Sequence, residues 1–214
     1  MTSTHDTDLV IRTLASQAGA RRYAPPYDAA LIIGAALSLV SAVALVLVLF
    51  GVRQADLQAT LGSAPFHHKV ACMLTLGCGG IVLARFAGRP GSSVLAFASL
   101  LPGAALLLFG AATDASGLPI LGASNISVPS CVSAIVLLSL PALAIVLVAI
   151  RMGVPTCPTF SGAVAGMLAG ALGAAAYAIV CKNDGALFVA IWYMVAVAIV
   201  TGLGALIGRR VLAW

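Results

Sequence analysis

Residues 29–52 read AALIIGAALSLVSAVALVLVLFGV, without one charged side chain. A helix of about 20 apolar residues crosses the hydrocarbon core of a bilayer, so this stretch is long enough to span a membrane. Five further apolar runs follow, separated by breaks that contain polar residues, proline or glycine. The runs lie at residues 29–52, 67–87, 94–112, 131–150, 160–180 and 187–207. The sequence therefore predicts an all-α fold, a bundle of six transmembrane helices.

The composition favours the same class. The 214 residues are 62% hydrophobic and only 8% charged, whereas about 25% is usual for a soluble domain. So few charges cannot cover a water-facing globule, and the gaps between the runs leave no room for a folded soluble domain. We expect a cytoplasmic tail at residues 1–28, the transmembrane domain at 29–208 and a short cytoplasmic end at 209–214.

The basic residues predict the orientation. Positive charge accumulates in the cytoplasmic segments of membrane proteins, and an N-terminus inside puts eight basic residues inside and three outside. The inner set is Arg12, Arg21, Arg22, Arg85, Arg89, Arg151, Arg209 and Arg210; the outer set is Arg53, Lys69 and Lys182. Both termini should therefore be cytoplasmic, in a multi-pass protein of a bacterial inner membrane. Because the net charge of +5 is dispersed between apolar runs, we expect no direct nucleic-acid binding.

Glycines repeat at intervals of four in the last two runs. They are Gly162, Gly166 and Gly170 in the fifth run, and Gly204 and Gly208 in the sixth. Small residues on one face let helix backbones approach closely in lipid. The pattern predicts helix packing within the bundle, with a homodimer face as the alternative.

Two of the five cysteines should meet at the outer face. Cys131 would open the fourth helix and Cys181 would close the fifth, at one membrane depth. In a bacterium this face meets the oxidising periplasm, where disulfides persist. They are candidate sensor cysteines, but two buried apolar residues or a fixed disulfide would fit equally. Cys72, Cys78 and Cys157 are expected to be packing residues, and the chain has no C-x-x-C motif.

Two histidines are candidate metal ligands beside that pair. His67 and His68 lie next to Lys69 at the outer start of the second helix. Cysteine with histidine suits a soft or borderline ion such as Cu(I) or Zn. The candidate metal set is therefore Cys131, Cys181, His67 and His68. Adjacent histidines point in different directions on a helix, so at most one should join, and interfacial polar residues are the alternative.

The tail contains a short amphipathic segment. Residues 7–17 read TDLVIRTLASQ, and apolar side chains recur there at helical spacing. Such a helix can lie on the membrane surface or dock in the groove of a partner. The candidate docking residues are Leu9, Ile11, Arg12 and Leu14.

Several short pieces, in this order and spacing, resemble the NrsF-type transmembrane anti-sigma factors. They are DLVIRTLA at 8–15, PFHHK at 65–69, Cys131, SLP at 139–141, RMGVPTCP at 151–158, YAIVC at 177–181, FVAIWY at 188–193 and GRRVLAW at 208–214. The resemblance runs over most of the chain and is densest from Cys131 onward.

The resemblance implies a regulator of transcription rather than an enzyme. Such a protein holds an extracytoplasmic-function sigma factor at the cytoplasmic face until a stress, heavy metal or oxidant, acts on a cysteine pair, here Cys131 and Cys181. No obligatory cofactor is implied, only a transient ion such as Cu, Cd, Zn or Cr. The family often has histidine before the second cysteine, where this chain has Val180, so His67 or His68 would have to substitute. The tail and the inner loops would contact the sigma factor.

Two other classes compete with this reading. A small metal or solute transporter needs polar or ionisable groups at membrane depth, and the predicted spans contain almost none. A membrane thiol oxidoreductase usually has a C-x-x-C pair with a lowered pKa, although a separated pair could also exchange with a partner.

Overall fold

The computed structural model describes residues 3–18, 26–51, 61–88, 94–122 and 127–213. These residues form helices and connecting loops, with no strand among them. The helices are α1 (Ser3–Ala18), α2 (Tyr27–Phe50), α4 (Ala64–Ala87), the 3-10 helix η1 (Val94–Leu100), α5 (Leu101–Ala112), α6 (Ser127–Arg151), α7 (Pro158–Tyr177), α8 (Ala186–Phe188), the π-helical turn η2 (Val189–Tyr193) and α9 (Met194–Val211). The all-α prediction is confirmed for the described residues.

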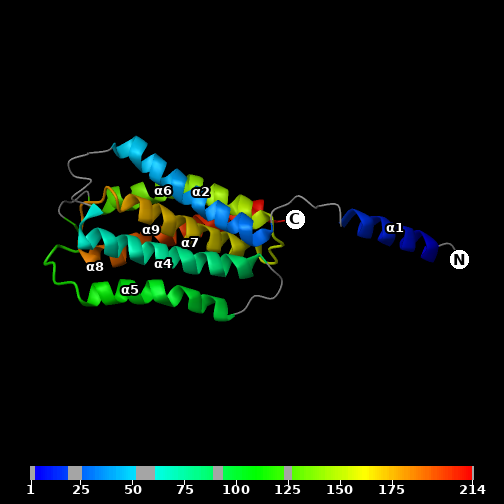
Figure 1. The fold of residues 1–214 in the computed structure, drawn as a ribbon, viewed down its shortest axis with the longest axis horizontal. Coiled ribbons are helices and arrows are strands. Elements are labelled where there is room, and N and C mark those ends of the chain that lie inside the picture. The colour runs from blue at the N-terminus through cyan, green and yellow to red at the C-terminus, as the bar shows by residue number, and fades with distance from the viewer. Residues whose placement is uncertain (1–2, 19–25, 52–60, 89–93, 123–126, 214) are drawn as a thin grey trace.

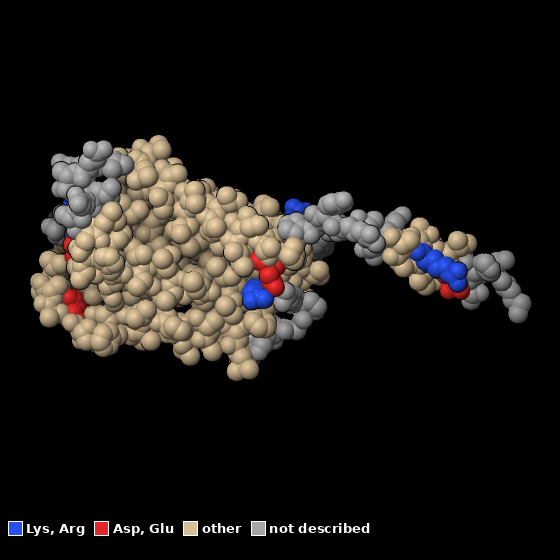
Figure 2. Space-filling model, viewed as in Figure 1, with Lys and Arg blue, Asp and Glu red and all other residues tan. Residues whose placement is uncertain are grey.

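Six helical segments are long and apolar enough to cross a membrane. They are Tyr27–Phe50, Ala64–Ala87, Leu95–Ala112, Ser127–Arg151, Pro158–Tyr177 and Ala186–Val211, in the order of the six predicted runs. Charged side chains on the visible face of the bundle gather at its two ends and leave an uncharged belt between them (Figure 2). This distribution is the one expected of a multi-pass membrane protein.

The third segment changes helix type along its length. Residues Val94–Leu100 are 3-10 helical, and an α-helix begins at Leu101 with Pro102 in its first turn. Proline suits the first turn of an α-helix because its missing N–H has no partner there. Pro102 therefore marks the start of α5 and does not interrupt an α-helix.

Helix α7 lies at the centre of the bundle, surrounded by α2, α4, α6 and α9 (Figure 1). Its glycines let α9 approach: a Cβ at Gly162 would collide with the carbonyl oxygen of Gly204, and one at Gly166 with that of Val200. The prediction that the spaced glycines form a packing face is confirmed. Close backbone contact supplies van der Waals packing where lipid offers no hydrophobic driving force.

The six segments alternate in direction, which gives the bundle two distinct ends. The cysteine end contains the ends of α2, α5 and α7 and the starts of α4 and α6; the tail end contains the starts of α2 and α7 and the ends of α4, α6 and α9. Of the described basic residues of the bundle, Arg85, Arg151, Arg209 and Arg210 lie at the tail end and Lys69 and Lys182 at the cysteine end. This agrees with the predicted orientation, which itself stays a prediction, as do the predicted domain limits.

Candidate functional site

Cys131 and Cys181 meet inside the cysteine end. Their Sγ atoms are 3.9 Å apart, and the two residues are only 3% and 6% exposed. Both are free thiols. The predicted proximity is confirmed, and the fixed disulfide, one of the open alternatives, is not what the structure contains.

The predicted positions on the helices need a small correction. Cys131 lies one turn inside α6, which begins at Ser127, and Cys181 lies beyond Tyr177, the last residue of α7. The chain after α7 tightens into a turn, because Val180 and Cys181 both donate backbone hydrogen bonds to the carbonyl oxygen of Tyr177. Such bonds satisfy the carbonyl groups that a helix end leaves unpaired. Cys181 is thus on a loop and Cys131 on a rigid helix.

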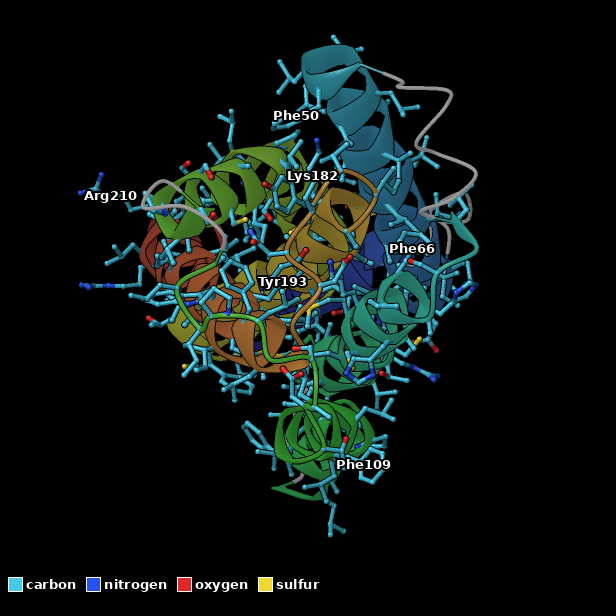
Figure 3. The ribbon with its side chains drawn as sticks, turned by 90° about the vertical axis from the view of Figure 1, so that its left-hand side faces the viewer. Phe50, Phe66, Phe109, Lys182, Tyr193 and Arg210 are labelled. Atoms are coloured by element: carbon cyan, nitrogen blue, oxygen red, sulfur yellow. The ribbon has the colours of Figure 1, made fainter. Side chains whose placement is uncertain are left out.

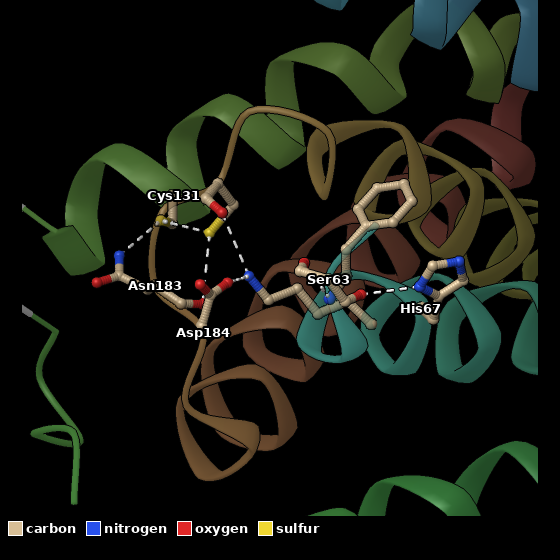
Figure 4. Close-up of polar contacts among 8 residues, drawn as sticks. Ser63, His67, Cys131, Asn183 and Asp184 are labelled. Carbon is tan, nitrogen blue, oxygen red and sulfur yellow. Dashed lines mark hydrogen bonds and ion pairs between the residues drawn. The ribbon is translucent and has the colours of Figure 1, made fainter. Parts of the chain in front are cut away.

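Polar groups converge on the sulfur of Cys131. The Tyr177 hydroxyl donates to it at 3.5 Å, and the Asn183 side-chain amide lies 3.7 Å away (Figure 4). Tyr177 precedes Cys181 by one helical turn, so the segment that positions one thiol also carries the hydroxyl that contacts the other. The four-residue spacing of Tyr177 and Cys181 is visible in the sequence and could have indicated this contact, whereas the role of Asn183 depends on the path of the loop.

A third polar group, the Tyr193 hydroxyl, is buried beside the pair. It is close enough to Cys181 to influence the pKa of that thiol, yet it makes no well-formed hydrogen bond. Tyr193 ends the π-helical turn Val189–Tyr193 and lies in the middle of the bundle (Figure 3). Single π-turns are frequent at functional sites because they shift the register of the side chains that follow.

Lys69 holds the loop that carries Cys181. Its ammonium donates to the Cys181 carbonyl oxygen at 3.2 Å and to Asp184 Oδ1 at 2.7 Å. Lys69 is 2% exposed and Asp184 is 49% exposed. A buried ammonium needs such partners, because an unpaired charge in a low-dielectric interior is costly.

The electrostatic setting of Cys181 favours its thiolate. The hydrogen bond from Cys131 lowers the pKa of the Cys181 thiol, and the nearby positive charge of Lys69 adds to this effect, against burial, which raises it. The net direction is downward. A lowered pKa increases the fraction of thiolate, the form that reacts with oxidants and binds metal ions.

A second anchor fixes the segment after this loop. Asp114 accepts a hydrogen bond from the backbone N–H of Leu187 at 2.7 Å and another from that of Ser116 at 3.0 Å. These bonds, with the Leu187 bond the strongest influence, lower the pKa of Asp114 to about 2. Asp114 therefore ties the loop after α5 to the start of α8.

The structure does not bring the two histidines to the cysteine pair. Nδ1 of His67 lies 2.8 Å from the Ser63 carbonyl oxygen, and Figure 4 shows the His67 ring pointing away from Cys131. His68 lies beside Cys72, with Nε2 3.6 Å from its sulfur. Among the described residues, no three His, Cys, Asp or Glu side chains are grouped closely enough to hold a metal ion.

The other three cysteines do not belong to the pair, and two of them differ from it in exposure. Cys72 is buried, and Cys78 and Cys157 are exposed. Cys78 lies on α4 and Cys157 immediately precedes α7 at the tail end. The two exposed cysteines offer matched controls for substitutions at the pair.

The tail helix is longer than predicted and presents its apolar side chains outward. Helix α1 runs from Ser3 to Ala18 and lies apart from the bundle in Figure 1. Leu9, Ile11, Arg12 and Leu14 are all exposed. The structure thus leaves the candidate docking residues accessible.

Comparisons with known proteins agree on one family. The family described as "Negative regulator of sigma F" (NrsF) matches residues 14–214. The chain is 32% identical to the anti-sigma-F factor NrsF of Caulobacter vibrioides over 97% of this chain and 99% of that protein. It is 39% identical to the probable anti-sigma-F factor NrsF of Azospira oryzae over 40% of each chain. No solved structure matches.

Proposed function

Because the chain belongs to the NrsF family of negative regulators of sigma F, we propose that it is an anti-sigma factor of the bacterial inner membrane. It binds an extracytoplasmic-function sigma factor at its cytoplasmic tail end and releases it when Cys131 and Cys181 meet a heavy metal or an oxidant. The observation that carries the sensing role is the 3.9 Å between the sulfurs of two buried free thiols, one on α6 and the other on the loop after α7.

Oxidation is one way in which this pair can respond. A disulfide has an S–S bond of about 2.05 Å, so the two sulfurs must approach by roughly half of their present separation. With hydrogen peroxide as oxidant, one thiolate attacks and breaks the O–O bond, becomes a sulfenic acid and expels hydroxide, which takes up a proton and leaves as water. The other thiol then attacks the sulfenic sulfur, the S–S bond forms, and the S–O bond breaks to release a second water. The two sulfurs together lose two electrons, which reduce the peroxide to water.

Metal binding is the second way in which the pair can respond, and the distance between the two sulfurs suits two ligands of one metal ion. Zinc–thiolate bonds of about 2.3 Å at a tetrahedral angle hold two sulfurs about 3.8 Å apart, close to the observed 3.9 Å. Thiolates select soft ions. The ion would be the signal and not a resident cofactor, and Cys131 and Cys181 would hold it without His67 or His68.

The position of the pair argues against the two rival classes. A transporter needs ionisable groups along a path at membrane depth. In the described part of the bundle, the buried serine, tyrosine and charged side chains are four serines, Lys69 near one end, and Tyr177 and Tyr193 beside the cysteine pair. A thiol oxidoreductase must present a sulfur to a partner protein, whereas both sulfurs here are almost fully buried. Small ions and peroxides can enter where a protein cannot.

Replacing the cysteines tests the sensing role. Cys131→Ser and Cys181→Ser should each abolish induction of a sigma-dependent reporter by cadmium or peroxide, because neither disulfide formation nor two-thiolate binding remains. Cys78→Ser, at an exposed position of α4, is the matched control and should respond normally. Normal induction in both pair variants, with the protein present in the membrane fraction, would exclude the sensing role.

Replacing the tail side chains tests the docking role. Leu9→Asp with Leu14→Asp should weaken sigma-factor binding by about tenfold or more, since truncated anchor side chains commonly cost 2 kcal/mol or more. Pull-down from detergent-solubilised membranes measures it, with Ala15→Asp, at an exposed position away from the face shared by Leu9 and Leu14, as a control for added charge. Unchanged binding in the double variant would assign docking to the inner loops.

A further inference from the structure

We propose that a change at the cysteine pair displaces α4, and that α4 passes this displacement to the start of α2, where the tail joins the bundle (the tail root, Tyr27 and Asp28). Lys69 is the positioning residue that couples the pair to α4. The inference rests on the proposed function and adds the route by which a change at one end of the bundle reaches the other. Polar contacts at both ends of α4 carry it.

At the cysteine end, α4 is bonded to the loop that carries Cys181. Cys131 is part of a long helix, whereas Cys181 lies on the loop after α7. Shortening the S–S distance therefore moves Cys181 more than Cys131. The Cys181 carbonyl oxygen and Asp184 are the two acceptors of Lys69, so displacement of this loop pulls on the second turn of α4.

At the tail end, the same helix is bonded to the residues that follow the tail. The Tyr27 hydroxyl donates to the Ala84 carbonyl oxygen at 2.8 Å. Arg85 binds both carboxylate oxygens of Asp28, at 3.0 and 2.9 Å. Tyr27 and Asp28 are the first two residues of α2, immediately after the tail. A displacement of α4 is therefore applied to the point where the tail enters the bundle.

The inner loop between α6 and α7 is bonded to α4 as well. The Val154 N–H of this loop donates to the Gly88 carbonyl oxygen at 3.0 Å. The Ser161 hydroxyl, in the first turn of α7, donates to the carbonyl oxygen of Ala87, also at 3.0 Å. Both acceptors lie at the end of α4. The tail root and the inner loop thus share this one helix as a neighbour.

Helix α4 can transmit a small displacement because it is continuous and closely seated. It runs unbroken from Ala64 to Ala87. Gly79 lies against the carbonyl oxygen of Ser99, and Gly103 of α5 lies against the backbone of Leu76. Small sliding movements between packed helices are a common form of conformational switching. Glycine contacts offer few side chains to obstruct such sliding.

The test uncouples α4 from the pair while leaving both cysteines in place. Full-length protein with bound sigma factor, in membrane vesicles, is treated with peroxide. Non-reducing peptide mapping measures the Cys131–Cys181 disulfide, and sedimentation measures the sigma factor released. Lys69→Met should hold the sigma factor before treatment. It should form the disulfide more slowly, because Cys181 loses the positive charge that helps to lower the pKa of its thiol. Compared with the wild type at equal disulfide, it should release at least about fivefold less sigma factor.

Two variants show whether the effect belongs to the Lys69 contact. Lys69→Arg keeps a cation that can donate to both acceptors and should restore release. Lys182→Met makes the same chemical change at an exposed lysine next to Cys181 and should behave as the wild type. Lys69→Met that releases in proportion to its disulfide, or that releases without peroxide, would overturn the relay.

The other end of α4 provides an independent test that spares the buried lysine. Tyr27→Phe combined with Asp28→Ala removes the hydrogen bond to the Ala84 carbonyl oxygen and both hydrogen bonds from Arg85. This double variant should reduce release to the same extent. Normal release in this double variant would also overturn the relay. Wild-type protein that forms the disulfide and keeps its sigma factor would instead overturn the proposed function. Failure of the relay and failure of the proposed function can therefore be told apart.

Discussion

The two ends of α4 hold the same kind of contact in opposite surroundings. At the cysteine end Lys69 is 2% exposed and pairs with Asp184; at the tail end Arg85 and Asp28 are 47% and 34% exposed. Surface ion pairs contribute about 0–1 kcal/mol, whereas breaking a buried pair costs about 3–5 kcal/mol. The contact of α4 with the Cys181 loop is therefore the stronger one, and its contact with the start of α2 is the weaker one.

The largest effect should come from removing the partner of the buried lysine. Asp184→Ala leaves the Lys69 ammonium buried without its counter-ion and should lower the free energy of unfolding by about 3 kcal/mol. Lys69→Met should cost less, because the Asp184 left behind is half exposed and can be hydrated. Thermal unfolding in detergent measures both. If Asp184→Ala lowers the free energy of unfolding less than Lys69→Met does, then the buried Lys69 ammonium does not depend on Asp184 as its counter-ion.

The smallest effect should come from the tail end. Asp28→Asn removes one charge of an exposed pair and should change the free energy of unfolding by about 1 kcal/mol or less. Because exposed pairs are screened by salt, the difference should shrink further at high ionic strength. The same unfolding measurements at low and high salt check it. If Asp28→Asn lowers the free energy of unfolding as much as Asp184→Ala does, then the Asp28–Arg85 pair is not weaker than the Asp184–Lys69 pair.

The fold could be predicted to a large extent from the sequence. Apolar runs of spanning length predicted the six helices, and the spaced glycines predicted a packing face within the bundle. That this face joins α7 to α9 is known from the structure. Counting spans also placed Cys131 and Cys181 at one depth. Their distance could not be obtained in this way, because it depends on how α6 and α7 pack and on the turn that follows Tyr177.

The groups around the pair were harder to predict for physical reasons. Lys69 looked like an ordinary charge at a helix end, since only the folded chain shows that its ammonium turns inward to Asp184. The place of Tyr193 beside the pair could not be predicted, because the π-helical turn that shifts its register leaves no mark in an apolar pattern. His67 and His68 attracted attention by residue type alone, and the structure places them with Ser63 and Cys72 instead.

The most direct test of sensing and release is to measure both in one sample. Wild-type protein with bound sigma factor is titrated with peroxide or cadmium, and at each step the linked or metal-bound fraction of Cys131 and Cys181 and the released sigma factor are quantified. We predict that the two fractions rise together. Release while both thiols remain free, or full modification of the pair without release, would contradict the account.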